Sequence, residues 1–102
     1  MSIDKIEIFL GRLGRKPDLR YTSKREAVCY LSVAVNSFNE NLSTWKRVVV
    51  WGKQAELCSL YLKKGSEVFV QGLNSIRQFE DQSGNRKSFE EIKAKVVGFT
   101  NV

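Results

Sequence analysis

Residues 44–62 read TWKRVVVWGKQAELCSLYL, and the first eight of them alternate between two faces. The two faces are Val48 with Val50, and Trp45 with Arg47 and Trp51. We therefore predict a strand at about residues 44–51 whose valine face joins the core. Residues two apart on a strand are separated by ~7 Å, so the other face presents two flat rings and a guanidinium in a row.

The second part of this stretch, residues 53–62, follows a helical period instead. Ala55, Cys58 and Leu62 recur at the spacing i, i+3, i+7, which predicts one helix of about ten residues. Lys63 and Lys64 follow at its predicted C-terminal end, where cations suit the helix dipole. Gly65 is then expected to be a left-handed cap.

A period of two returns on both sides of the quoted stretch. It predicts further strands at residues 5–10, 27–36, 66–79 and 91–96. Residues 81–85, Asp-Gln-Ser-Gly-Asn, are expected to form the turn of a long hairpin arm. Five strands with one helix between the third and fourth is the order of the five-stranded Greek-key barrel, the OB-fold, which binds oligonucleotides and oligosaccharides. We therefore predict an all-β fold of this kind.

Composition limits what the chain can do. It has 102 residues, with 17 Lys and Arg, 11 Asp and Glu and no His, which gives a net charge of +6. This length predicts a single domain over residues 1–102. Without His there is no imidazole base and no His-ligated metal, so we predict no enzyme, no metal and no cofactor. A nuclease is a weaker alternative, because the carboxylates do not cluster in the sequence.

The location of the protein and the state of its thiols follow from similar arguments. No apolar run reaches the ~18 residues that a membrane span needs, and the N-terminus lacks the layout of a signal peptide. We expect a cytoplasmic protein with no membrane partner. Cys29 and Cys58 form no Cys-x-x-Cys pair and are expected to be reduced and buried, with a disulfide as the alternative.

Aromatic residues are the first candidates for a binding site. Trp45 and Trp51 can stack on bases or sugars, or they can belong to the core or a subunit interface. Phe79, on the predicted arm, can be a stacking ring or an aromatic latch against a neighbouring subunit. Phe38 follows a strand in a turn-rich segment and is either a stacking residue or a loop anchor. The stacking interpretation fits single-stranded nucleic acid as the ligand, because such a strand offers rings and phosphates in alternation.

Four stretches of the chain resemble the bacterial-type single-stranded DNA-binding protein family. They are residues 11–22, 44–56, 61–72 and 81–84, and the similarity extends over nearly the whole chain. Gly11 and Gly14, in the first stretch, are expected to be turn and bulge residues of a barrel. The resemblance implies an OB-fold that usually assembles as a homotetramer and binds single-stranded DNA with little sequence preference. It also implies protection of that DNA in replication, recombination and repair, at the nucleoid.

The resemblance also assigns roles to individual residues. Trp45, Trp51 and Phe79 stand at the positions of the family's stacking aromatics, and Phe38 matches a fourth across a gap. Basic positions that contact the DNA backbone in relatives are matched by Lys5, Arg20, Arg47, Lys53, Lys63, Lys64, Arg77 and Lys87. The resemblance does not separate DNA from RNA as a ligand.

The sequence departs from the family pattern in three places. Residues 38–43 form a shorter loop than is common, and Lys46 stands where relatives often have a His at a subunit contact. The flexible linker and acidic tip that recruit replication and repair proteins have no counterpart before Val102. We therefore expect such partners only if a tail is missing from this chain. The alternative is a short replication-restart accessory protein on the same barrel, usually a dimer, which acts mainly through protein contacts.

Overall fold

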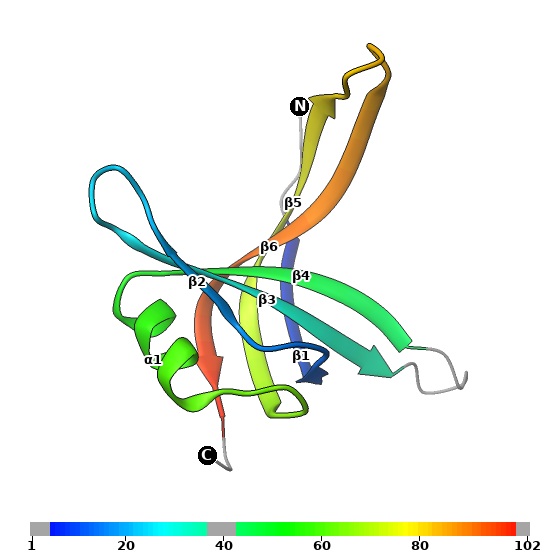
Figure 1. Cartoon of the computed structure of the whole chain (residues 1–102). Coiled ribbons are helices and arrows are strands. Elements are labelled where there is room, and N and C mark those ends of the chain that lie inside the picture. Colours follow the sequence, from blue (N-terminus) through cyan, green and yellow to red (C-terminus); the bar gives the residue numbers. More distant parts are fainter. Residues whose placement is uncertain (1–4, 37–42, 100–102) are drawn as a thin grey trace.

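The structure, a computed structural model, describes residues 5–36 and 43–99 (Figure 1). Most of these residues lie in strands and one short helix interrupts them, so the predicted all-β class is confirmed. The elements in chain order are β1 (Lys5–Leu13), β2 (Asp18–Tyr21), β3 (Ala27–Asn36), β4 (Ser43–Trp51), α1 (Lys53–Tyr61), β5 (Glu67–Glu80) and β6 (Arg86–Gly98).

The strand β2 is one that the sequence alternation did not predict. It pairs antiparallel with β3, from Asp18 opposite Tyr30 to Tyr21 opposite Ala27. Its four residues alternate between charged and apolar or aromatic side chains, but the run is too short to predict a strand without the pairing to β3. The described residues therefore contain six strands rather than five, and the helix follows the fourth strand rather than the third.

The strand β1 joins the two ends of the sheet. The strand order is β1-β5-β6-β4-β3-β2, and β1 pairs with both β5 and the far end of β3. Five strands thus pair in a ring, with β2 added beside β3. Gly11 lies where β1 passes from one partner to the other, and a Cβ there would come within 2.5 Å of the carbonyl oxygen of Ala34. The missing side chain lets the two backbones approach. The pairing of β1 with β5 keeps an unbroken register through Gly11, so the turn or bulge predicted for this glycine is not found there.

The core fills the inside of this ring. The predicted inward faces of β3 and β4 are both buried, and β5, β6 and α1 complete the cluster. Its largest fully buried side chains are Leu31, Ile92, Val33, Val48, Val50, Val68, Val70, Cys29 and Cys58. Burial of each aliphatic side chain of this size stabilises the fold by about 1.5–3 kcal/mol before entropy is counted. The two thiols are free, as predicted, and burial raises the pKa of Cys29 to about 11 and of Cys58 to about 12.

The first half of β1 turns its apolar face outward. Ile6, Ile8 and Leu10 are 61–67 % exposed, whereas Phe9 packs against the core. Glu7, on the same face as Phe9, pairs with Lys46 of β4. The alternation predicted the strand correctly but did not reveal which of its faces lies inside.

The helix α1 covers part of the core and ends one residue earlier than predicted. Ala55 and Cys58 are its buried residues, and the side chain of Gln54 bonds to the backbone of Lys95 and Val97 on β6. Leu62 is extended, so Lys63 and Lys64 lie beyond the helix and not in its last turn. No helix in the described part of the chain is long and apolar enough to cross a membrane.

Gly65 has the predicted left-handed backbone, with φ of 90°, but it is not the helix cap. It lies in the turn between α1 and β5, where its N–H donates to the carbonyl oxygen of Leu13 at 2.8 Å. The positive φ predicted from the glycine is therefore correct, and the place predicted for it at the end of the helix is wrong.

The hairpin of β5 and β6 forms an arm that extends away from the ring (Figure 1). Its turn, residues 81–85, lies where it was predicted. One oxygen of Asp81 accepts hydrogen bonds from the backbone N–H groups of Ser83 and Asn85, both at 2.9 Å, and Gly84 has φ of 80°. The turn is thus stabilised by its own side chain and does not need contact with the ring.

Candidate nucleic-acid interface

One face of the sheet brings together most of the aromatic candidates. On β4, Trp45 lies opposite Ala34 of β3, Arg47 opposite Ser32, and Trp51 opposite Val28. The small neighbours leave room above the sheet, so Trp45 is 61 % exposed and Trp51 is 39 % exposed. Both rings are therefore open to a ligand within this chain, and neither belongs to its core.

Trp45 is held in place by the turn that follows β1. Its six-membered ring occupies the space that a Cβ on Gly14 would need. Any side chain at this position would displace the ring. Gly14 therefore positions Trp45, in addition to the turn role predicted for it.

Trp51 lies at the other end of β4. It lines an open hollow of about 470 Å³ together with Thr22, Lys24, Glu26 and Lys93. The hollow combines an aromatic ring with two ammonium groups, a pairing that suits a base and a phosphate.

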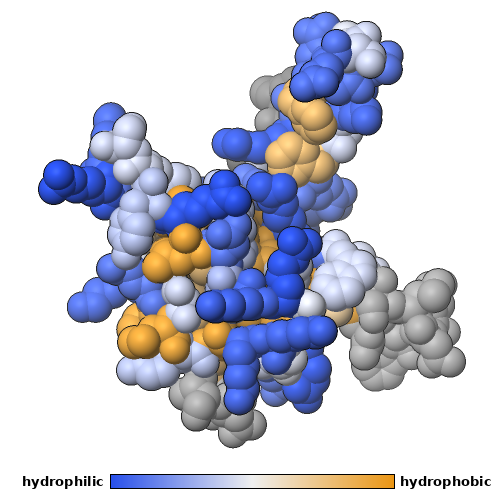
Figure 2. Space-filling model, viewed as in Figure 1, coloured by the Kyte–Doolittle hydropathy of each residue, from blue (hydrophilic) through white to orange (hydrophobic). Residues whose placement is uncertain are grey.

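A larger open groove of about 910 Å³ crosses the middle of the same face. Its aromatic and basic lining comes from Arg15, Arg20, Tyr30, Trp45, Arg47 and Phe89. Figure 2 shows hydrophilic side chains spread over the region of β2, β3 and β4 and again on the arm. Rings and cations alternate along this groove, so a single strand laid in it would meet both in turn.

Cation–ring contacts connect the groove internally. The guanidinium carbon of Arg20 lies 5.9 Å from the ring centroid of Tyr30, and that of Arg47 lies 5.1 Å from the rings of both Tyr30 and Phe89. Tyr30 and Phe89 were not among the site residues predicted from the sequence. Tyr30 lies on the face of its strand that mixes polar and apolar residues, and this pattern could have identified it from the sequence. Phe89 reaches the groove only through the pairing of β6 with β4, which the sequence does not reveal.

The arm carries the other predicted ring. Phe79 is partly exposed, and its ring meets Phe89 edge-on, with centroids 5.7 Å apart and planes at 63°. Arg77 is paired with Glu91 at 3.6 Å and Lys87 with Asp81 at 3.5 Å. Phe79 thus continues the line of rings from the groove onto the arm.

The remaining predicted basic residues lie elsewhere. Lys53 begins α1, Lys63 and Lys64 follow it, and Lys5 is in β1. Among the described residues, these four do not line either hollow. Phe38 is outside the described residues.

Charges around the groove keep their usual signs. A hydrogen bond with Asp18 raises the pKa of Arg20, so this guanidinium stays cationic. A hydrogen bond from Tyr21 to Glu56 raises the pKa of the phenol. The face is therefore cationic at neutral pH and attracts phosphates.

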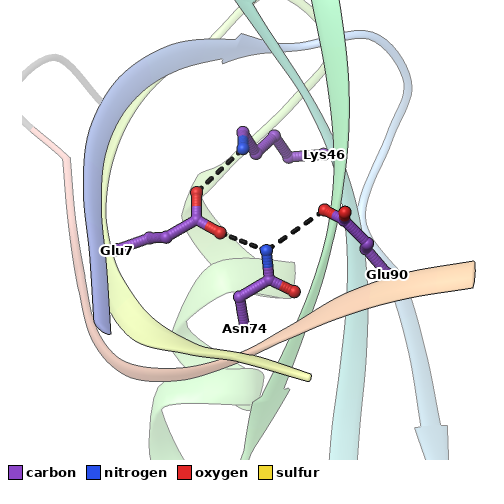
Figure 3. A network of polar contacts seen from close by, with 4 residues as sticks. All are labelled: Glu7, Lys46, Asn74 and Glu90. Carbon is purple, nitrogen blue, oxygen red and sulfur yellow. Dashed lines mark hydrogen bonds and ion pairs between the residues drawn. The ribbon is translucent and has the colours of Figure 1, made fainter. Parts of the chain in front are cut away.

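A polar network joins four strands beside the groove (Figure 3). Lys46 on β4 donates to Glu7 on β1 at 2.8 Å, and the amide of Asn74 on β5 donates to Glu7 and, at 3.1 Å, to Glu90 on β6. Burial alone would raise the pKa of Glu7, but the hydrogen bonds from Lys46 and Asn74 outweigh it and lower the pKa. Lys46, at the position where relatives often have a His, thus makes an ion pair within the chain.

Comparison with protein families gives a match. It covers residues 4–100, nearly the whole chain, and the family is the single-strand binding protein family, which confirms the resemblance predicted from the sequence. Its members have an OB-fold that binds single-stranded DNA, in keeping with the ring of strands and the groove of rings and cations. This chain therefore belongs to the single-strand binding protein family.

Proposed function

We propose that this protein binds single-stranded DNA with little sequence preference, by stacking bases on aromatic side chains and neutralising phosphates. The observation that carries the proposal is the mixing of rings and cations on one open face. Trp45, Arg47 and Trp51 lie in a row on β4, and Phe89 connects Arg47 to Phe79 on the arm. Every base has a π-face, so stacking is tolerant of sequence. Lys and Arg release counterions from the phosphates, so affinity should fall with salt at a log–log slope of about −0.7 per phosphate contacted.

The individual roles have different support. Trp45, Trp51, Phe79, Arg20 and Arg77 are proposed as DNA contacts on both geometry and family resemblance. The family resemblance alone supports Phe38 as a stacking residue, and Lys5, Lys53, Lys63, Lys64 and Lys87 as backbone contacts.

Family membership supports a proposal for the biological role. We propose that the protein acts as one domain without catalytic activity, in the cytoplasm at the nucleoid. There it would protect single-stranded DNA during replication, recombination and repair. Coating of this kind needs affinity without sequence readout, which is what stacking platforms supply.

An exposed apolar face supports self-association as part of this function. Ile6, Ile8 and Leu10 of β1 point outward, and the register of β1, β5 and β6 places Phe69 and Val96, both also exposed, beside them. Contiguous exposed apolar side chains of this extent mark interfaces. Within the described residues, residues 5–10 pair only with β5, so the other backbone edge of β1 is open to a further strand. We propose that a second copy covers this face, in a homotetramer or alternatively a dimer.

The test of DNA binding is a titration with oligo(dT), followed by tryptophan fluorescence at low and high salt. Trp45 and Trp51 are the two tryptophans of the chain, and both lie on the proposed face. We expect strong quenching, affinity that salt weakens, and no competition from duplex DNA. Absence of quenching at micromolar DNA and low salt would refute the stacking mechanism.

A matched pair of variants sharpens this test. Trp45→Ala should weaken binding by about 5- to 150-fold, since a stacked base contributes about 1–3 kcal/mol. Leu60→Ala removes a side chain that is 71 % exposed on α1, away from the groove, and should bind as the unchanged protein does. If Trp45→Ala also left the affinity unchanged, the restart-accessory interpretation, with aromatics as protein contacts, would be favoured.

A further inference from the structure

Arg47 belongs to a cluster of two rings and a guanidinium that we call the Arg47 cluster, composed of Tyr30, Arg47 and Phe89. The Cζ atom of Arg47 lies 5.1 Å from each ring centroid, within the ~6 Å reach of a cation–π contact. The three side chains come from β3, β4 and β6, and all three line the same groove. Three strands thus place a planar cation against two planar rings.

Glu91 fixes the cation of this cluster. One of its oxygens lies 3.2 Å from Nε of Arg47, and the other lies 3.6 Å from Nε of Arg77. The side chain of Glu91 is only 13 % exposed, whereas that of Arg47 is about half exposed. One shielded carboxylate therefore occupies the Nε side of Arg47 and sets the orientation of its plane.

This pairing makes Arg47 a poor phosphate contact. If a phosphate replaced Glu91 as the partner of the Arg47 guanidinium, Glu91 would stay shielded from solvent and lose one of its two cationic partners. A shielded carboxylate that loses a partner costs free energy. The pair of Arg20 with Asp18 is different, because both side chains are largely exposed and water screens them. Arg20 can exchange its carboxylate for a phosphate easily, and Arg47 cannot.

About half of the Arg47 side chain stays exposed in the groove, beside the two rings, so the cluster as a whole can meet a base. Guanidinium planes and aromatic rings are both surfaces on which nucleic-acid bases stack. On β4, Arg47 is two residues from Trp45, a spacing of ~7 Å, which suits neighbouring bases of an extended strand. Phe89 also touches Phe79, so the cluster connects the groove to the arm.

We propose that the Arg47 cluster is a base-stacking subsite in which Arg47 acts through its plane and Glu91 is its positioning residue. The proposal rests on the single-stranded DNA binding proposed above and assigns Tyr30 and Phe89 to it as base contacts. It also changes the role of Arg47, which the sequence analysis expected to contact the DNA backbone.

The salt dependence of binding separates the two roles of Arg47. Affinity for oligo(dT) is measured over a range of salt for the unchanged protein, Arg47→Ala and Arg47→Lys. We expect Arg47→Ala to weaken binding by about 5- to 10-fold, the lower part of the stacking range, with an unchanged log–log slope. Arg47→Lys keeps the charge but not the plane, so we expect it to bind as weakly as Arg47→Ala. Unimpaired binding by Arg47→Lys, or a slope reduced by about 0.7 in Arg47→Ala, would overturn the proposal.

Variants of the other members test the cluster itself. Phe89→Leu and Tyr30→Leu keep apolar bulk but remove the rings, and each should weaken binding about 5-fold with an unchanged slope. Glu91→Gln releases Arg47 from its carboxylate, so we expect the slope to become steeper by about 0.7 if Arg47 gains a phosphate. Wild-type affinity in both ring variants, or an unchanged slope in Glu91→Gln, would contradict the assignment.

The outcomes also separate this inference from the proposed function. The two tryptophans remain in every one of these variants, so quenching still reports binding. If the unchanged protein fails to bind oligo(dT), the proposed function fails. If it binds and the Arg47 cluster variants bind equally well, only the subsite fails. Thermal unfolding of each variant serves as the folding control.

Discussion

At the scale of single residues, the exposed ring of Trp45 depends on a residue that has no side chain. A large aromatic that is 61 % exposed would move freely unless something fixed it. Gly14 provides the fixed surface, since the ring lies where a Cβ would otherwise be. A stacking residue held in this way loses less conformational entropy when a base binds.

We therefore predict that Gly14→Ala weakens DNA binding without unfolding the protein. The added methyl group must displace the ring of Trp45, so affinity for oligo(dT) should fall by about 3- to 10-fold as part of the stacking energy is lost. Gly98→Ala is the matched control, because a Cβ there meets only Phe69, at an ordinary 3.8 Å. The check is a fluorescence titration of both variants with a thermal melt of each. Equal affinities for the two would show that Trp45 does not need this support.

At the scale of elements, the Glu7–Lys46–Asn74–Glu90 network links β1, β4, β5 and β6 through side-chain hydrogen bonds (Figure 3). Its groups are partly buried, so the ion pair of Glu7 and Lys46, with both side chains 22 % exposed, is less screened than a surface pair. The arm leaves the ring close to this point, at Asn74 and Glu90. The network thus fixes the base of the arm.

Stability should depend on pH through Glu7. Its pKa is lowered in the folded protein, so its contribution is fully present above its ordinary value of 4.5 and is lost as pH falls through the folded-state pKa. We expect Glu7→Gln to lower the free energy of unfolding by about 1–3 kcal/mol near neutral pH, as for a lost hydrogen bond to a charged group. The difference from the unchanged protein should shrink in acid. Urea unfolding at about pH 7 and about pH 3 measures both.

Glu67→Gln is the matched control for this prediction. Glu67 also pairs with a cation, Arg12, but at 3.8 Å and with both side chains largely exposed. Removing its charge should change the free energy of unfolding by less than about 1 kcal/mol near neutral pH. A loss of equal size at both pH values for Glu7→Gln would mean that the side chain acts by packing and not by charge.

The elements also show what sequence can and cannot predict. The strand at residues 44–51 and its ring-bearing face were predicted, because a period of two is a local property of the chain. The strand β2 was not, because four residues are too short a run for the period to show. The outward face of β1 was not, because it depends on pairing with β5, which is distant in sequence. For the same reason Trp45 was a candidate from the sequence, whereas Phe89 joined the site only through strand pairing.

At the scale of the whole molecule, the two functional faces lie on different parts of the sheet. The groove crosses the side of β3, β4 and β6 that carries Tyr30, Arg47 and Phe89. The apolar face surrounds Ile8 and is formed by β1 and by the parts of β5 and β6 that lie beside it, away from the arm. A second copy that covers the apolar face therefore need not cover the groove. When a long strand is bound in one groove of an oligomer, the other grooves meet it at a high effective concentration. The oligomer should therefore bind a long strand more tightly than a single groove does.

Ile8→Lys tests this arrangement. Ile8 lies in the middle of the apolar face, opposite Gln71, so an ammonium there would have to be buried without a partner in any oligomer that covers it. We expect the mass in solution, measured by light scattering, to fall from an oligomer toward the 11.7 kDa of one chain. Leu60→Lys, on exposed α1, should leave the mass unchanged. The dissociated variant should bind a short oligo(dT) as the oligomer does but bind a long one more weakly, since only the long strand reaches several grooves. A mass of 11.7 kDa for the unchanged protein would refute the interface, and equal affinities for the two lengths in both proteins would refute the gain from multiple grooves.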